Sequence, residues 1–270
     1  MPHRPVPTPD PAARSGSLSE PPSVELSIVV PYYNPGPRLR ENVERLLEVL
    51  SVAGVRFEVI AVSDGSTDGS AETLEGLGGG SLRRVTLATN AGKGEALRVG
   101  LTMGRGEWLG FIDADGDLSP ELLGPFVSLM RLYGPDIILG SKRHPMSDVH
   151  YPPLRRAYSW GYQQLIALLF HLEVRDTQTG IKLIRREVLA AVLPKMVEKR
   201  FAFDLELFVV ARHLGYDQLL EVPVRISERF SSTISARAVG RIFLDTLAIW
   251  YRLHLRRHYG RGSGRGAETG

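Results

Sequence analysis

Strand-like and helix-like patterns of apolar residues alternate along the first half of the chain. Runs rich in β-branched and aromatic residues, which suit buried strands, cover residues 24–33, 56–66, 83–90, 107–115 and 135–142. Segments whose apolar residues recur at helical spacing lie between them, at residues 36–53, 66–77, 92–104 and 120–134. This alternation predicts an α/β fold with a mostly parallel sheet and helices on both of its faces.

The pattern changes after residue 142. Helical spacing continues in three segments, at residues 155–172, 201–215 and 235–260. A loop, a short strand and a helix are expected within residues 175–193, and a further strand within residues 216–226. The C-terminal part of the fold should therefore be rich in amphipathic helices.

The two ends of the chain differ in composition from the rest. Residues 1–22 contain seven prolines and little to bury, which is typical of a disordered tail, and the glycine-rich residues 261–270 predict a flexible one. We therefore expect one domain over residues 23–236, followed by a basic amphipathic helix at residues 237–260.

Polar residues follow each predicted strand of the first half. In "GFIDADGDLSP", Asp113, Asp115 and Asp117 alternate directly after an apolar run. Carboxylates this close repel one another unless a cation or a proton intervenes, and Mg²⁺ or Mn²⁺ prefers such oxygen ligands. Because ligands of open α/β sheets bind at the carboxyl ends of the strands, we expect these residues to gather at one edge. The alternative is an ordinary Asp-Gly turn.

Two other strand ends carry residues that suit a nucleoside or a phosphate. In "VSDGSTDGS", Asp64 can accept hydrogen bonds from a base or a ribose, and Gly65 permits close approach of the backbone. In "NAGKGEA", Lys93 lies between glycines and could pair with phosphate. Ordinary loop and surface roles explain either motif equally well when it is taken alone.

The composition narrows the chemistry and the surroundings of the protein. With no cysteine among 270 residues, the chain has neither disulfides nor thiolate metal ligands. The formal charge is only +3, but residues 237–261 hold six arginines against one acid, which suits an anionic partner such as nucleic acid, a phospholipid or a phosphorylated substrate. No apolar run approaches the ~20 residues of a membrane span, and no signal peptide is recognisable. We expect a cytoplasmic protein that can lie on a membrane surface.

Seven segments together resemble family 2 glycosyltransferases. They are "SIVVPYYN", "VIAVSDGSTDG", "NAGKGEALRVG", "FIDADGDLSPE", "DIILGSKR", "DTQTGIKLIRRE" and "FAFDLELF". Their order over residues 25–235 is most similar to the branch that makes dolichyl- or polyprenyl-phosphate glucose and mannose. The resemblance implies a Rossmann-like GT-A fold. It also implies an inverting, metal-dependent transfer of a hexose from UDP-glucose or GDP-mannose, with UDP-glucose favoured.

The resemblance also implies roles for individual residues. Asp115 would bind Mg²⁺ or Mn²⁺, with Asp117 as a second ligand where many relatives have glutamine, and Asp113 would lie near the ribose and phosphates. The metal would offset the charge of the departing diphosphate. The whole donor-binding set would be Pro31, Tyr33, Asn34, Asp64, Gly65, Ser66, Lys93, Asp113, Ala114, Asp115 and Lys142.

The acceptor can be inferred from chemistry as well. A sugar hydroxyl needs a general base, whereas a lipid phosphate is already anionic and needs cations to hold it. The candidate cations, besides Lys142, are Arg143, Arg155, Arg156, Lys182 and Arg229. Polymer-forming relatives carry a Gln-x-x-Arg-Trp motif, which this chain lacks. We therefore expect a polyprenyl-phosphate acceptor on the cytosolic face of a membrane, and no nucleic acid partner.

Alternatives stay open on function. A soluble glycosyltransferase could use Asp204 as the catalytic base for a small hydroxyl acceptor, although Asp204 and Glu206 could equally form ion pairs on a helix. A nucleotide-sugar-binding scaffold without catalysis is the second alternative. The chain departs from its relatives at two places. It has Lys142 where relatives have arginine, and it lacks the lysine that relatives have near "FSSTISAR". Either departure could change how the acceptor phosphate is bound.

Two apolar surfaces also have more than one interpretation. They are residues 165–170 and a face of the last helix formed by Val239, Ile242, Phe243, Thr246, Ile249, Trp250 and Leu253. Either surface could contact a membrane, or pack on the sheet or on a second subunit of a homodimer.

Overall fold

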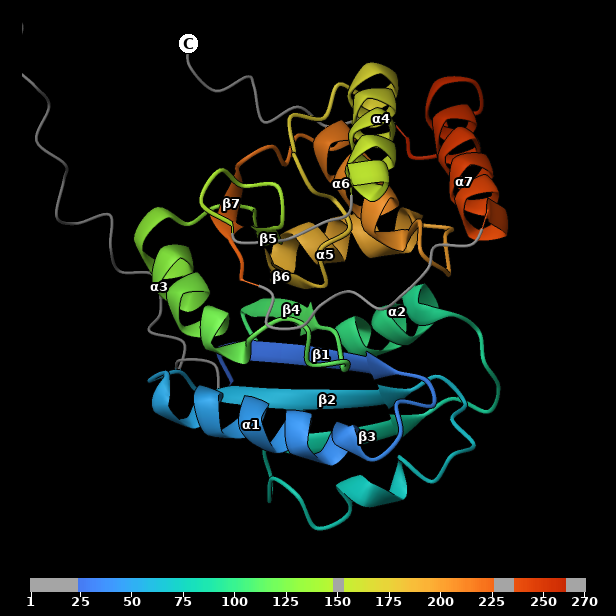
Figure 1. Ribbon diagram of the computed structural model, residues 1–270. Helices are drawn as coiled ribbons and strands as arrows, with labels where there is room; N and C mark the ends of the chain where they lie inside the picture. The colour runs from blue at the N-terminus through green and yellow to red at the C-terminus, as the bar shows by residue number, and fades with distance from the viewer. Residues whose placement is uncertain (1–23, 148–152, 226–235, 261–270) are drawn as a thin grey trace, which may run out of the picture.

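The computed structural model describes residues 24–147, 153–225 and 236–260, and its strands form one seven-stranded sheet (Figure 1). The strands are β1 (Leu26–Tyr32), β2 (Phe57–Ser63), β3 (Leu82–Thr86), β4 (Trp108–Ile112), β5 (Ile137–Ser141), β6 (Ile181–Arg185) and β7 (Leu219–Pro223). Their order in space is β3-β2-β1-β4-β6-β5-β7. Strand β6 runs antiparallel to β4 and β5, and the other pairs are parallel. The predicted mostly parallel α/β sheet is confirmed.

Helices cover both faces of this sheet (Figure 1). They are α1 (Arg38–Val52), α2 (Lys93–Met103), α3 (Leu123–Tyr133), α4 (Pro153–Phe170), α5 (Arg186–Val192), α6 (Phe203–His213) and α7 (Ala236–His254). Helices α1 and α3 pack on one face, and α2, α5 and α6 pack on the other. Alternate residues of β1 face opposite ways, so Ile28 joins the first core and Val29 the second, and both are fully buried.

The terminal helix belongs to the second of these cores. Ile249 of α7 and Tyr259 beyond it are fully buried there, and the Thr246 hydroxyl lies 3.0 Å from the hydroxyl of Tyr162 in α4. The predicted apolar face of α7 therefore packs against the chain itself at Thr246 and Ile249. Within residues 165–170 of α4, Ile166 is buried in the same way.

The helix expected at residues 66–77 is wrong, because this segment holds only a short 3₁₀ turn at Glu72–Leu74. The Asp68 carboxylate accepts hydrogen bonds from both the backbone and the hydroxyl of Ser70, at 3.1 and 2.6 Å. Such local bonds compete with helical ones. Gly69 and Gly76, both at positive φ, further favour turns.

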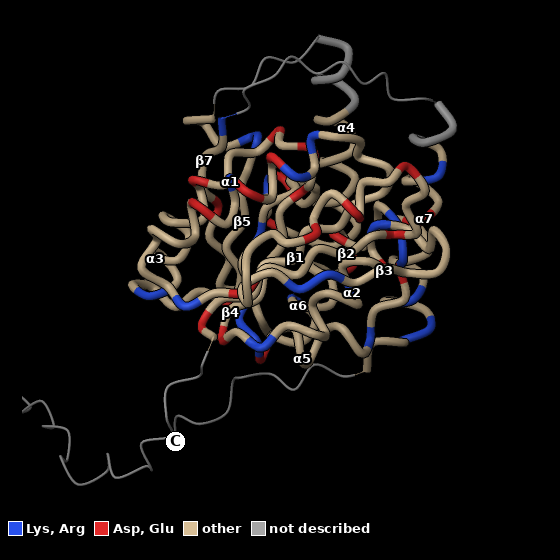
Figure 2. Tube along the Cα trace, turned by 90° about the horizontal axis from the view of Figure 1, so that it is seen from below, with Lys and Arg blue, Asp and Glu red and all other residues tan. Residues whose placement is uncertain are grey.

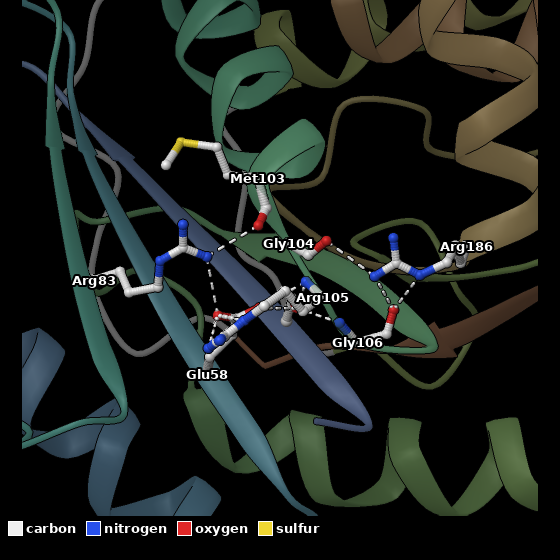
Figure 3. Close-up of polar contacts among 8 residues, drawn as sticks. Glu58, Arg83, Met103, Gly104, Arg105, Gly106 and Arg186 are labelled. Atoms are coloured by element: carbon white, nitrogen blue, oxygen red, sulfur yellow. Dashed lines mark hydrogen bonds and ion pairs between the residues drawn. The ribbon is translucent and has the colours of Figure 1, made fainter. Parts of the chain in front are cut away.

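A buried polar network fastens the edge of the sheet where the parallel strands begin (Figure 3). Glu58 in β2 is 1% exposed, and its carboxylate accepts hydrogen bonds from the Arg105 guanidinium at 2.8 and 3.1 Å. Ser27 and Arg83 donate to the same carboxylate at 2.8 and 3.2 Å. Arg186 donates to two carbonyl groups of the loop before β4, at 2.8 and 2.9 Å. This network lies opposite the edge at which a ligand is expected.

Charges of both signs are interspersed along the described trace (Figure 2). The basic C-terminal region is partly used inside the molecule, because Arg252 forms ion pairs with Glu198 and Glu206. Arg256 and Arg257 remain exposed. The predicted tails, residues 1–22 and 261–270, lie outside the described residues.

Candidate active site

A cleft of about 660 Å³ opens at the carboxyl ends of β1, β2 and β4. Its lining consists of Pro31, Tyr32, Tyr33, Pro35, Arg38, Asn42, Asp64, Asn90, Gly92, Lys93, Ala96, Asp113, Ala114, Asp115, Arg200 and Phe201. The edge is the one at which open α/β sheets bind ligands, and the volume lies in the range of small-molecule sites. Seven predicted donor-binding residues line it, namely Pro31, Tyr33, Asp64, Lys93, Asp113, Ala114 and Asp115.

Asp113 and Lys93 form an ion pair in the cleft. The Lys93 ammonium lies 2.5 Å from Oδ1 of Asp113, and each side chain is 27% exposed. Burial alone would lower the pKa of Lys93, but the carboxylates of Asp113, Asp204 and Asp115 outweigh burial and raise this pKa. Lys93 therefore stays positively charged, as a lysine that pairs with phosphate must be.

Strand β6 determines where Asp113 lies. The backbone N–H of Asp113 donates to the carbonyl of Gly180 at 2.9 Å. A Cβ at position 180 would come 1.9 Å from Oδ2 of Asp113, so the carboxylate can occupy this place only beside a glycine. The glycine of "DTQTGIKL" thus has a direct role in the shape of the site.

Asp115 is exposed and lines the cleft, whereas Asp117 is outside the lining. The backbone N–H of Asp117 donates to Oδ1 of Asp115 at 3.1 Å and fixes the turn between them. Loss of hydration in the cleft, and then the charge of Asp113, raise the pKa of Asp115. A nearby cation would relieve both effects, so the residues fit a hard divalent ion.

Protein ligands alone would not complete the shell of such an ion. The described parts of the chain contain no group of three or more His, Cys, Asp or Glu residues that could hold a metal. Mg²⁺ is commonly bound by one or two carboxylates together with substrate phosphates and water. Asp115, with Asp117 as the expected second ligand, matches this pattern.

Asp64 lines the cleft but is committed to the neighbouring loop. It is 3% exposed, and its two carboxylate oxygens accept the backbone N–H groups of Ala91 and Gly92 at 2.7 and 2.9 Å. These bonds hold the loop from which α2 begins, and so they place Lys93. A contact between Asp64 and a nucleobase remains a prediction.

The other four predicted donor-binding residues lie outside the lining. They are Asn34, Gly65, Ser66 and Lys142. The backbone N–H of Asn34 donates to the Ser66 hydroxyl at 3.0 Å, which ties the loops after β1 and β2 together. Gly65, at φ +72°, permits the close approach of the β3–α2 loop, and the Lys142 N–H donates to Asp176 at 3.0 Å. These contacts give the four residues a part in holding the loops around the cleft, and their contact with a donor stays a prediction.

Lys182 and Asp204 form a buried ion pair outside the cleft lining. Lys182 is fully buried, and its ammonium lies 2.8 Å from Oδ1 of Asp204, which is 5% exposed. The ammonium also donates to the Thr179 carbonyl at 2.6 Å. Because no lipid phosphate can reach a lysine so enclosed, the prediction that Lys182 binds the acceptor is wrong. Asp204 is equally ill placed to act as a general base.

None of the remaining acceptor candidates is among the described residues that line the cleft. Arg143 is half-buried, donates to the Arg175 carbonyl at 3.4 Å and lines a separate hollow beside α4. Arg155 and Arg156 fall in the first turn of α4, and Arg229 lies outside the described residues. Binding of the acceptor phosphate by these arginines stays a prediction.

The structure adds cleft residues that the sequence patterns did not single out. Arg38 and Asn42 come from α1, where the Asn42 side-chain amide donates to the Ala114 carbonyl at 2.9 Å. Their position just after β1 is a signal that was available. Arg200 and Phe201 come from the segment before α6. No local pattern marks them, because only the tertiary fold brings that segment to the cleft.

Comparison with proteins of known sequence gives one family. The family model described as "Glycosyl transferase family 2" matches residues 27–193. The chain is 34% identical to "Dolichyl-phosphate beta-glucosyltransferase" of Drosophila melanogaster over 257 residues, which are 87% of this chain and 77% of that protein. It is 31% identical to the Homo sapiens protein of the same name over 229 residues, 77% of this chain and 67% of that one.

Comparison with solved structures gives the same type of fold. The chain superposes with a TM-score of 0.65 on glucosyl-3-phosphoglycerate synthase from Mycobacterium tuberculosis, solved in complex with Mn²⁺, UDP and phosphoglyceric acid. The match covers 88% of this chain and 79% of that one at 20% identity. At this identity the likeness establishes the fold alone.

Proposed function

The chain belongs to glycosyltransferase family 2, in the dolichyl-phosphate glycosyltransferase branch, and from this premise we propose that it transfers glucose from UDP-glucose to a dolichyl or polyprenyl phosphate. The resemblance predicted from the sequence is confirmed, as is the GT-A fold. Family membership makes the protein a glycosyltransferase, against the alternative of a non-catalytic scaffold. The names of its relatives favour glucose over mannose, and we take UDP-glucose as its donor.

The state of the carboxylates in the cleft supports a phosphate acceptor. Asp64 accepts two backbone N–H groups, Asp113 is paired with Lys93, and Asp204 lies outside the lining. Asp115 is the remaining carboxylate among the described lining residues, and it suits a cation. A hydroxyl acceptor needs a general base, whereas a phosphate acceptor is already ionised. The cleft therefore favours the phosphate.

The proposed reaction is a single displacement. An oxygen of the acceptor phosphate attacks the anomeric carbon while the bond from that carbon to the diphosphate breaks, and UDP leaves. The α-linked donor then gives a β-linked product, in keeping with "beta" in the relatives' names. Lys93, kept charged by Asp113, would lie beside the diphosphate. A divalent ion held by Asp115 and Asp117 would supply Lewis-acid stabilisation of the leaving group.

Helix α7 offers a surface for the membrane that carries the acceptor. Leu244, Leu247, Tyr251 and Leu255 recur at helical spacing and are 37–65% exposed, with Arg256 and Arg257 exposed beside them. None of the helices in the described ranges is long and apolar enough to cross a bilayer. We therefore propose that this stripe lies in the membrane interface, on the cytosolic face.

Lipid extraction tests the proposal directly. The purified chain is incubated with a short polyprenyl phosphate and radiolabelled UDP-glucose or GDP-mannose, and label is measured in the organic phase. We expect label from UDP-glucose in the presence of Mn²⁺ or Mg²⁺, and loss of transfer with a chelator. Asp115→Asn should lower kcat/KM by ~100-fold or more, because it removes a group that helps to stabilise the negative charge of the leaving diphosphate.

Matched controls separate this result from damage to the fold. Glu121→Gln alters an exposed carboxylate outside the cleft lining and should leave transfer unchanged. Transfer of label only to a water-soluble hydroxyl compound would contradict the phosphate acceptor. Absence of both transfer and donor hydrolysis would contradict the activity as a whole.

A further inference from the structure

The segment before α6 forms one wall of the cleft. We call residues 197–201 the wall segment; its Arg200 and Phe201 line the cleft, and Phe201 is 64% exposed. The segment lies across the first turn of α2, where the Glu95 N–H donates to the Lys199 carbonyl at 3.1 Å. A Cβ at Gly92 would come 2.5 Å from that carbonyl oxygen, so a glycine beside Lys93 permits the approach.

The chemistry of the wall segment suits a phosphorylated ligand. Arg200 brings an exposed guanidinium to a cleft that already contains the Lys93 ammonium. A planar guanidinium can bind two phosphate oxygens at once, which an ammonium cannot. The position of Arg200 therefore decides whether its guanidinium joins Lys93 and Arg38, the other cations of the described lining, in holding a phosphate.

Glu206 anchors the wall segment from inside the protein. This residue of α6 is fully buried, and its Oε2 accepts the backbone N–H groups of Val197 and Glu198 at 2.8 and 2.7 Å. A buried carboxylate is costly unless both of its oxygens are satisfied. The partner of Oε1 thus contributes to the anchor.

The hydrogen-bond donor to Oε1 comes from the end of the described chain. Tyr259 is fully buried, and its hydroxyl donates to Oε1 of Glu206 at 2.6 Å. Arg252 of α7 donates to the Tyr259 hydroxyl at 3.2 Å, forms an ion pair with Glu198 of the wall segment, and lies 3.5 Å from Oε1 of Glu206. Burial, and then the charge of Glu206, raise the pKa of Tyr259, so its hydroxyl remains a donor at any working pH.

From these contacts we propose that Tyr259, acting through Glu206, is a positioning residue that sets the wall segment and with it the hold of Arg200 on a phosphate group. The inference rests on the proposed function, because the phosphate belongs either to the sugar donor or to the lipid acceptor. Tyr259 lies beyond residues 27–193, the stretch that the family model matches. The end of the described chain, from Arg252 of α7 to Tyr259, would thus support the active site, beside the proposed membrane contact of α7.

Tyr259→Phe is the direct test, because it removes the donated hydrogen bond and keeps the buried ring. We expect the KM for one phosphate-bearing substrate to rise about 5- to 10-fold with kcat changed by less than about twofold, as loss of a binding interaction does. Measuring the KM of UDP-glucose and of polyprenyl phosphate separately identifies which phosphate Arg200 holds. Tyr133→Phe, at a 67% exposed tyrosine of α3, is the matched control.

A double-mutant cycle separates positioning from general stability. If Tyr259 acts through Arg200, then Arg200→Ala raises the same KM, and adding Tyr259→Phe raises it no further. Glu198→Gln, which loosens the wall segment from its Arg252 side, should affect the same KM. Unchanged KM values in Tyr259→Phe, or effects that add in the double variant, would overturn the inference. A wild-type chain that transfers no glucose would instead overturn the proposed function.

Discussion

Lys182 and Asp204, which form a buried ion pair near the cleft, have a structural role. The Lys182 ammonium lies 4.9 Å from the ring centre of Phe111 and 5.7 Å from that of Phe208, in surroundings where an unpaired charge is costly. Asp204 offsets that charge at 2.8 Å, and its own charge also helps to raise the pKa of Lys93. Asp204 therefore supports the cleft cation from outside the described lining of the cleft.

Removing one member of this pair should destabilise the protein severely. Asp204→Asn leaves the Lys182 charge buried and uncompensated, so we expect the free energy of unfolding to fall by about 3–5 kcal/mol. The double variant Lys182→Met/Asp204→Leu removes both charges and should recover most of that loss. Urea denaturation measures both.

The same two variants test the role of Asp204 in catalysis. A double variant that is stable and still transfers glucose would exclude Asp204 as an obligatory base. If the double variant were as unstable as the single one, charge pairing would not be the cause of the loss.

At the scale of elements, α7 has two apolar faces, one buried and one exposed. Thr246 and Ile249 are buried in the core, while Leu244 and Leu247 belong to the exposed stripe that continues to Leu255. The face for which the sequence left membrane contact and internal packing open is mainly a packing face. Among its described side chains, Phe243 is exposed, at 44%. A helix that serves the core on one side and a lipid surface on the other needs both faces apolar.

The exposed stripe predicts measurable binding to vesicles. Replacing Leu244 and Leu247 by glutamine should weaken binding to phospholipid vesicles by about 10-fold or more, because burying each leucine is worth roughly 1.5–3 kcal/mol. Flotation of the full chain with vesicles measures this. Leu132→Gln, at a 71% exposed leucine of α3, is the control. Equal binding of wild type and the α7 variant would contradict the assignment of the stripe.

The sequence predicted elements well where one pattern dominated. The apolar runs of β1 and β4 are buried on both faces, and α1 buries Leu39, Val43, Leu46 and Leu50 as its periodicity indicated. It failed where side chains compete with the backbone, as in the turn at Asp68, and it left two roles open where an apolar pattern suits either, as in α7. It also missed Arg200, because contacts between distant segments follow from the fold and not from spacing.

At the scale of the molecule, ligand chemistry and structural support occupy opposite edges of the sheet. The cleft lies at the carboxyl ends of the strands, and the Glu58 network lies where the parallel strands begin (Figure 3). Burial alone would raise the pKa of Glu58, but hydrogen bonds from Arg105, Ser27 and Arg83 outweigh burial and lower it. The charged form of Glu58 is therefore the stabilising one.

This direction gives the dependence of stability on pH. The contribution of Glu58 is fully present above the ordinary glutamate pKa of about 4.3 and is lost as the pH falls through the lower value of the folded state. Glu58→Gln should reduce the free energy of unfolding by about 2 kcal/mol at neutral pH and make its decline in acid shallower. Glu121→Gln removes a carboxylate that is 51% exposed and pairs with Arg45. It should lower the free energy of unfolding by only about 0–1 kcal/mol. If the free energy of unfolding declined equally steeply in acid for wild type and Glu58→Gln, this account would be contradicted.

The reversed strand β6 also determines when during synthesis the active site can exist. Lys93, Asp113 and Asp115 leave the ribosome early, but the Gly180 carbonyl that receives the Asp113 N–H emerges much later, and Arg200 later still. Until then β4 is an open edge of a partial sheet, and pairing between distant segments is slow to form. A nascent chain therefore lacks a complete cleft, and a ligand of the cleft can stabilise the protein only after residues 180–201 have been made.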